Sequence, residues 1–305
     1  MHCKKQKLNF RNFTTMKFVL WVYLLSTQGL LSAAEAPHRI WPGLAPGESV
    51  NSAGIQLPSP SHYDPPITLM TKVTEPTFTV HPAAVPNGTG VVILPGGGFH
   101  RVVPDLEGTE TVDFLNRIGV TVFVLSYRTK NSPEETGWEK PLQDAQRMMA
   151  LIRNRAAQWD LDKDRIGLLG YSAGGQVAAR LLSSNGKLAY TPVDDIDTTK
   201  HRPDFSLLIY PWGVYDEDND GLIDGVSVSK TYPPTFLVHT DDDRSSSIGS
   251  VLIYAGLKKR GISAELHVYG NGGHGYGVRP QKNSEISTWT RHAGHWLDRW
   301  IKGNH

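Results

Sequence analysis

Apolar residues along this 305-residue chain fall into short runs that alternate with stretches of helical spacing. Short apolar runs between turn-forming residues are typical of buried strands, and recurrence every ~3.6 residues predicts amphipathic helices. The expected strands are 67–70, 77–81, 90–94, 120–127, 166–169, 205–210, 235–240 and 264–269, the first two forming an antiparallel hairpin. The expected helices are 109–117, 140–159, 176–182, 247–260 and 284–301. This alternation predicts an α/β fold, a doubly wound and mostly parallel sheet with helices on both faces.

The last expected helix carries a stripe of large apolar side chains on one face. The stripe consists of Ile286, Trp289, Ala293, Trp296, Leu297 and Trp300. We expect these tryptophans to pack against the sheet rather than to form a platform for a sugar.

A candidate nucleophile lies where one apolar run meets a helix. The segment Gly170-Tyr171-Ser172-Ala173-Gly174-Gly175 follows the strand 166–169 and precedes the helix 176–182. Strand, tight turn and helix around G-x-S-x-G form the context of a nucleophile elbow, in which flanking glycines permit a sharp turn. The alternative is a glycine-rich turn that merely packs a helix on a strand. We interpret Ser172 as the nucleophile.

A serine nucleophile needs a base, which the glycine-rich loop 270–277 supplies as His274. This loop follows the last expected strand, so the imidazole can reach across the ends of the strands. His100, beside a glycine run near the start of the fold, is the rival candidate.

The group that orients the base is expected at the end of the strand 235–240, which runs directly into Asp241, Asp242 and Asp243. Spacing alone leaves the choice among these aspartates open. The order serine, aspartate, histidine along the chain is that of α/β-hydrolases.

An oxyanion hole is expected where the strand 90–94 meets Gly96-Gly97-Gly98. Backbone N–H groups of Gly97, Gly98 and Ala173 are the predicted donors to the developing negative charge. The alternative is a loop that only lets strand and helix approach closely. The expected walls of the acyl pocket are Phe99, Tyr171, Trp212 and Tyr276.

Several segments in this order resemble one branch of the α/β-hydrolases. They are 94–99, 125–128, 142–147, 170–175, 233–243 and 272–277. Together they resemble the secreted carbohydrate-esterase-like branch, near acetyl xylan esterases and feruloyl-esterase-like domains, over residues 40–301. The resemblance implies an α/β-hydrolase fold and ester hydrolysis without a cofactor.

The same resemblance favours Asp243 over Asp242, because related enzymes usually carry the acid four residues after the position of His239. It also implies that Arg128 and Asp144 form a structural pair bracing the sheet against the long helix. The chain departs from the pattern at 105–108, where relatives tend to have a histidine before the Glu-Gly pair, and at Arg244, where a proline often follows the acid. Both departures are expected to alter substrate contacts.

The first 34 residues predict a signal peptide. Basic residues without any acidic one precede an apolar run, 18–31, that ends in Ser32-Ala33-Ala34. The run is short and interrupted for a membrane span, so we expect cleavage near Ala34 and one catalytic α/β-hydrolase domain, 35–305. Translation from Met1 or Met16 stays open. Cleavage would remove Cys3, the single cysteine, so we expect a periplasmic or secreted bacterial enzyme without disulfides.

The charge balance of the chain bears on nucleic-acid binding, and one segment resembles a calcium-binding loop. Without the basic leader, acidic residues outnumber basic ones, which does not suggest nucleic-acid binding. Residues Asp216 to Asp224 place oxygens at several positions of a calcium loop, but Ser227 stands where the bidentate glutamate belongs. Because Asn219-Asp220-Gly221 is a good turn by itself, we expect a turn and no metal.

The leading hypothesis is therefore a serine esterase that removes acetyl or similar short acyl groups from polysaccharide, with acylated carbohydrates or other small esters as substrates. No cofactor and no stable membrane insertion are expected. The only room for a lid is the short segment 210–234, which predicts an open cleft. The alternatives are a prolyl-oligopeptidase-like serine peptidase, which normally carries a large propeller domain, and a catalytically inactive homologue that binds carbohydrate.

Overall fold

The centre of the fold in the computed structural model, which describes residues 1–2 and 37–303, is an eight-stranded sheet. Its strands lie in the order β1-β4-β6-β5-β7-β8-β11-β12. Their bounds are β1 His38–Arg39, β4 Thr77–His81, β5 Gly90–Leu94, β6 Thr121–Ser126, β7 Ile166–Tyr171, β8 Ser206–Ile209, β11 Thr235–Thr240 and β12 Ala264–Tyr269. The six strands from β6 to β12 are parallel, and only β1 and β4 run antiparallel to their neighbours. The predicted mostly parallel sheet is confirmed.

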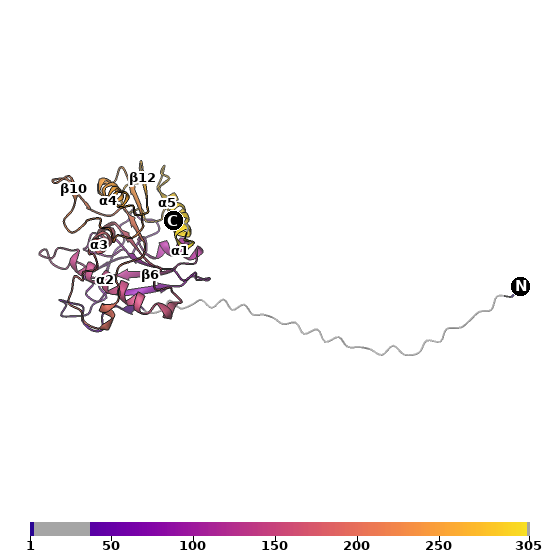
Figure 1. Ribbon diagram of the computed structural model, residues 1–305, viewed down its shortest axis with the longest axis horizontal. Helices are drawn as coiled ribbons and strands as arrows, with labels where there is room; N and C mark the ends of the chain where they lie inside the picture. Colours follow the sequence, from indigo (N-terminus) through magenta and orange to yellow (C-terminus); the bar gives the residue numbers. More distant parts are fainter. Residues whose placement is uncertain (3–36, 304–305) are drawn as a thin grey trace. The chain divides into compact units, whose positions relative to one another are not determined.

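Helices cover both faces of this sheet, as predicted (Figure 1). Their bounds are α1 Val112–Arg117, α2 Glu139–Asn154, α3 Ser172–Ser183, α4 Ile248–Lys259 and α5 Trp289–Ile301. The helices α2, α3 and α4 share one buried cluster with alternate residues of the strands, and α1 and α5 share the other. Because successive strand side chains point to opposite faces, every residue of β5 is buried.

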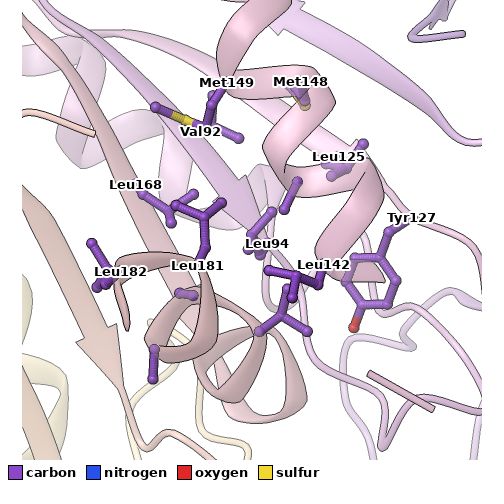
Figure 2. Packing of buried hydrophobic residues seen from close by; sticks show 14 of the residues in the cluster. Val92, Leu94, Leu125, Tyr127, Leu142, Met148, Met149, Leu168, Leu181 and Leu182 are labelled. Carbon is purple, nitrogen blue, oxygen red and sulfur yellow. The ribbon is translucent and has the colours of Figure 1, made fainter. Parts of the chain in front are cut away.

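The core between the sheet and α2 is densely apolar. Figure 2 shows Met148 and Met149 of this helix together with Val92, Leu94 and Leu125 of the adjoining strands. At the end of β6, the guanidinium of Arg128 lies 2.9 Å from the Asp144 carboxylate, and both side chains are fully buried. A buried ion pair of this kind specifies how the helix sits on the sheet, consistent with the structural role expected for it.

The stripe on α5 packs into the core as predicted. Trp289 is fully buried, Trp296 is nearly so, and the ring centroid of Trp300 lies 4.3 Å from that of Phe205.

The prediction that the strands 67–70 and 77–81 form a hairpin is wrong. The strand β3, Leu69–Thr71, pairs with β2, Ile55–Leu57, in a separate two-stranded sheet, whereas β4 pairs with β1 and β6. The intervening chain is diverted because the N–H groups of Thr74 and Glu75 donate to the Ser52 carbonyl. Local alternation predicts strands but not their partners.

The segment that resembled a calcium loop forms a hairpin between β9, Tyr215–Asp216, and β10, Gly221–Leu222. The Asp216 carboxylate accepts hydrogen bonds from the N–H groups of Asp218 and Asn219. The hairpin packs against α4.

The predicted signal peptide and its cleavage position lie outside the described residues. Within the described part of the chain, no helix is both long and apolar enough to cross a bilayer.

Candidate active site

Ser172 lies at the sharp turn between β7 and α3 and has a φ of 49°. A positive φ is strained for a residue with a side chain, and such strain is typical of functional turns. The glycines of the motif are needed because a Cβ on Gly174 would collide with the Leu94 carbonyl oxygen and one on Gly170 with the Gly174 oxygen. The chain therefore turns as the elbow pattern predicts.

The structure brings the predicted nucleophile, base and acid together. The Ser172 Oγ lies 2.7 Å from Nε2 of His274, and Nδ1 of His274 lies 2.7 Å from Oδ2 of Asp243. With the ring proton on Nδ1, the imidazole donates to the carboxylate and its Nε2 accepts from the serine hydroxyl. This geometry suits transfer of the serine proton to the ring.

The Asp243 carboxylate has hydrogen-bond partners besides His274. Its Oδ1 accepts from the Ser245 N–H at 2.8 Å, and its Oδ2 lies 3.2 Å from Nε2 of the buried His239. Burial raises the pKa of Asp243, but the hydrogen bonds from His239, His274 and the Ser245 N–H outweigh it and lower the pKa to about 2. The carboxylate is therefore ionised at neutral pH.

Asp242 has a different position from its neighbour. Its two oxygens accept from the N–H groups of Gly272 and Gly273, at 3.2 and 2.8 Å. The Gly273 N–H is the main reason why the pKa of this exposed carboxyl is lowered. Asp242 thus binds the backbone of the loop that carries His274, and Asp241 is exposed.

The predicted oxyanion loop leaves two donors unengaged. In the described structure, the N–H groups of Gly97 and Gly98 have no hydrogen-bond partner, and both residues have positive φ. The third predicted donor, Ala173, lies fully buried in the first turn of α3. The N–H of Gly96 is already used, because it donates to Oε2 of Glu107 at 3.1 Å.

A buried bridge that the sequence analysis missed joins the oxyanion loop to the histidine loop. Oε1 of Glu107 accepts from the Tyr210 hydroxyl at 2.9 Å, and the same hydroxyl accepts from the Gly277 N–H at 3.0 Å. Burial raises the pKa of Glu107, opposed by Tyr210, His274 and the Gly96 N–H. The only sequence signal was the Glu-Gly pair at 107–108, which spacing alone does not connect to Tyr210.

Ser172 and His274 open onto a cavity of about 500 Å³. The other lining residues are Pro60, His62, Tyr63, Ile67, Leu69, Gly97, Gly98, Arg101, Val103, Leu106, Glu107, Trp212, Arg244 and Gly275. One wall therefore comes from residues 60–69, which lie between β1 and β4 in the sequence and which the sequence analysis did not assign to the site.

The four predicted pocket residues lie in different places. Trp212 lines this cavity, and Tyr276 lines an adjoining one. Tyr171 does not line it, because the last residue of β7 points into the core, where its hydroxyl lies 2.8 Å from that of Thr111. Phe99 packs against Gly137 and the core instead. The rival base, His100, lines a separate cavity.

Comparison with known proteins identifies the family of the chain. The sequence model of the prolyl oligopeptidase family matches residues 139–304, and the BD-FAE model matches residues 67–209. An acetylxylan esterase of Xylanibacter ruminicola is 24% identical over 243 residues, which are 70% of this chain and 46% of that protein. The endo-1,4-beta-xylanase B of Butyrivibrio fibrisolvens is 26% identical over 62% of this chain and 32% of its own length. The chain thus spans half or less of these curated relatives.

Among solved structures, an acetyl ester-xyloside bifunctional hydrolase from Caldicellulosiruptor lactoaceticus superposes with a TM-score of 0.64 at 26% identity. The superposition covers 88% of this chain and 97% of that one. It confirms the expected α/β-hydrolase fold over nearly the whole described chain. Because one family model alone matches more than half of the sequence, the chain belongs to the prolyl oligopeptidase family and is an esterase-like α/β-hydrolase.

Proposed function

We propose that this chain is a serine esterase that hydrolyses acetyl-type esters on carbohydrates, with Ser172, His274 and Asp243 as its catalytic triad. The observation that carries the proposal is the pair of 2.7 Å contacts that link these three side chains, of which Ser172 and His274 line one cavity. The acetylxylan esterase and the acetyl ester-xyloside hydrolase among its relatives support an ester on a sugar as the substrate. The predicted signal peptide supports export to where polysaccharide is found.

In the proposed mechanism, Oγ of Ser172 attacks the ester carbonyl carbon while Nε2 of His274 takes the hydroxyl proton. The carbonyl oxygen becomes an oxyanion, to which the N–H groups of Gly97, Gly98 and Ala173 donate. His274 then gives its proton to the leaving alcohol oxygen, which breaks the ester bond and leaves Ser172 acylated. Water, deprotonated by the same imidazole, releases the acid and restores the serine.

The open cleft favours short acyl groups. Of the segment 210–234, which was expected to form any lid, only Trp212 lines the cavity in the described structure, and the hairpin of β9 and β10 packs against α4. A long acyl chain gains ~0.8 kcal/mol for each CH₂ only if that CH₂ is buried, and an uncovered cleft buries few of them. Acetyl esters are therefore the expected substrates.

A second candidate, peptide-bond hydrolysis, is favoured by the match to the prolyl oligopeptidase family. The same triad would serve either reaction, since acyl transfer to serine is common to both. The two candidates differ in the leaving group that His274 must protonate, an alcohol or an amine.

The test is hydrolysis of 4-nitrophenyl esters of two to eight carbons, of acetylated xylan and of dipeptide amides by purified mature protein. We expect acetyl esters to react fastest and acetate to be released from the polymer without added metal. Ser172→Ala and His274→Ala should each nearly abolish turnover, and the double variant should be little worse, because the residues act as a unit. A rate that rises through eight carbons, or faster cleavage of dipeptide amides, contradicts the proposal.

A further inference from the structure

Two arginines line the same cavity as Ser172, and neither has a carboxylate partner in the described structure. Arg101 and Arg244 are both exposed. By contrast, Arg279 in the adjoining cavity is paired with Glu110. Glu107, the single carboxylate among the lining residues described, is buried, and its oxygens accept from Gly96 and Tyr210. The charges that face the solvent of this cavity are therefore positive.

The backbone of Arg101 is fixed by the oxyanion loop. Its N–H donates to the Gly97 carbonyl at 3.3 Å, within the turn that presents the N–H groups of Gly97 and Gly98. The next residue, Val102, exchanges backbone hydrogen bonds with Met70 of β3 at 2.8 and 2.9 Å. The backbone from which the Arg101 side chain extends is therefore held in place beside the predicted oxyanion hole.

Arg244 is fixed by the loop that carries the triad acid. It lies between Asp243 and Ser245, whose N–H donates to the Asp243 carboxylate and whose hydroxyl accepts from the Gly213 N–H, both at 2.8 Å. Its guanidinium lies 5.0 Å from the ring centroid of Trp212, within cation–π range. The Trp212 ring in turn lies 5.0 Å from that of His274.

Tyr63, which lines the same cavity, is acted on electrostatically by both of these arginines and by Arg279. Burial and the Glu107 carboxylate raise the pKa of the Tyr63 phenol, whereas Arg101, Arg279 and Arg244 each act to lower it. All three guanidinium groups are thus within electrostatic reach of one hydroxyl in the wall formed by residues 60–69. Arg279 already has Glu110 as its counter-charge, so a neutral sugar would leave Arg101 and Arg244 without one.

We propose that the cleft binds sugars carrying an anionic group, a carboxylate or a sulfate, and that Arg101 and Arg244 recognise this group next to the ester. This inference rests on the proposed function and narrows its substrate class. The planar guanidinium fork matches both anions in geometry, and its charge-assisted hydrogen bonds are stronger than those a neutral hydroxyl would make. The anion belongs to the alcohol part of the ester, because both arginines are exposed to solvent, into which the rest of a polymer must extend.

Binding to the Ser172→Ala protein tests the proposal without needing turnover. The probes, measured by isothermal titration calorimetry, are a glucuronate-bearing xylo-oligosaccharide, its O-sulfated counterpart and the neutral oligosaccharide of the same length. We expect at least one anionic probe to bind about 10-fold more tightly than the neutral one, and the advantage to shrink as salt shortens the Debye length below ~10 Å. The better anionic probe identifies the group as carboxylate or sulfate.

The arginines are then replaced one at a time in the same background. Arg101→Gln and Arg244→Gln should each raise the Kd of the anionic probe about fivefold and leave the Kd of the neutral probe unchanged. Arg260→Gln is the matched control, since Arg260 is exposed at the end of α4 and does not line the cavity. Equal affinity for all three probes, or losses that are the same for charged and neutral probes, overturns the inference. Failure of the wild-type protein to hydrolyse any ester would instead overturn the proposed function.

Discussion

Replacing Asp243 by asparagine should remove most of the activity while keeping the fold. An ionised carboxylate can only accept, so Nδ1 of His274 carries the ring proton and Nε2 is free for the serine. In Asp243→Asn the amide oxygen accepts from the Ser245 N–H, as Oδ1 does now at 2.8 Å. This orientation places the NH₂ group where Oδ2 now lies, 2.7 Å from Nδ1.

The ring must then carry its proton on Nε2, the atom that faces Ser172, where it cannot accept the hydroxyl proton. His239 does not oppose this arrangement, because its Nε2 also lies 2.9 Å from the Ser245 carbonyl and keeps that acceptor. Loss of the correct tautomer typically costs ~10⁴-fold in kcat, which corresponds to about 5.5 kcal/mol in activation free energy.

Two neighbouring aspartates provide matched controls. Asp242→Asn loses one of two acceptors for the Gly272 and Gly273 N–H groups, about 1 kcal/mol or roughly fivefold in kcat through the loop that carries His274. Asp241→Asn should change kcat less than about twofold, because the side chain is exposed.

The assay is kcat for 4-nitrophenyl acetate at pH 7, with thermal unfolding of each variant to show that it is folded. A folded Asp243→Asn protein within ~10-fold of the wild-type kcat would refute the tautomer argument. Equal, mild losses at all three aspartates would mean that the orienting acid lies elsewhere.

Three further predictions concern stability and the buried bridge. Because the pKa of Asp243 is lowered to about 2 in the folded state from about 4 when unfolded, its contribution to stability is present above pH ~4 and lost as pH falls toward 2. Urea unfolding at several pH values should therefore show that the free energy of unfolding falls less between pH 4 and pH 2 in Asp243→Asn than in the wild-type protein. An equal fall in both proteins would contradict this. Added calcium should not shift the melting temperature, and a chelator-reversible shift abolished by Asp216→Ala would overturn that expectation. Tyr210→Phe leaves the Gly277 N–H and Glu107 without their shared partner, so kcat should fall about 10-fold with little change in KM. A change in KM alone would indicate a role in binding instead.

The sequence predicted the parts of this fold that depend on short stretches of chain. The strands β5, β7, β11 and β12 are apolar runs bounded by turn residues, and the elbow at Ser172 is encoded within six residues. The order of serine, aspartate and histidine followed from the strand ends that carry them. Choosing Asp243 among three adjacent aspartates needed the resemblance to related enzymes, because all three follow the same strand.

The remaining features depend on contacts between residues far apart in the chain. Tyr210 and Glu107 are 103 positions apart, and nothing in either local pattern predicts their hydrogen bond. Tyr171 was misplaced because its neighbour Ser172 faces the cavity, whereas the alternation of β7 turns the tyrosine toward the opposite core. The contribution of residues 60–69 to the cavity depends on the pairing of β3, which alternation does not specify.

The tight packing of glycines around the elbow has a consequence for how this scaffold can diverge. A single methyl group on Gly174 would strike the Leu94 carbonyl, and one on Gly175 would press against Pro211. The glycines beside Ser172 therefore tolerate almost no substitution. The wall at 60–69 stands next to β3 in its own two-stranded sheet, apart from the ladder of the central strands. Replacement of residues 60–69, in evolution or by protein engineering, can therefore change substrate preference while the catalytic residues stay the same.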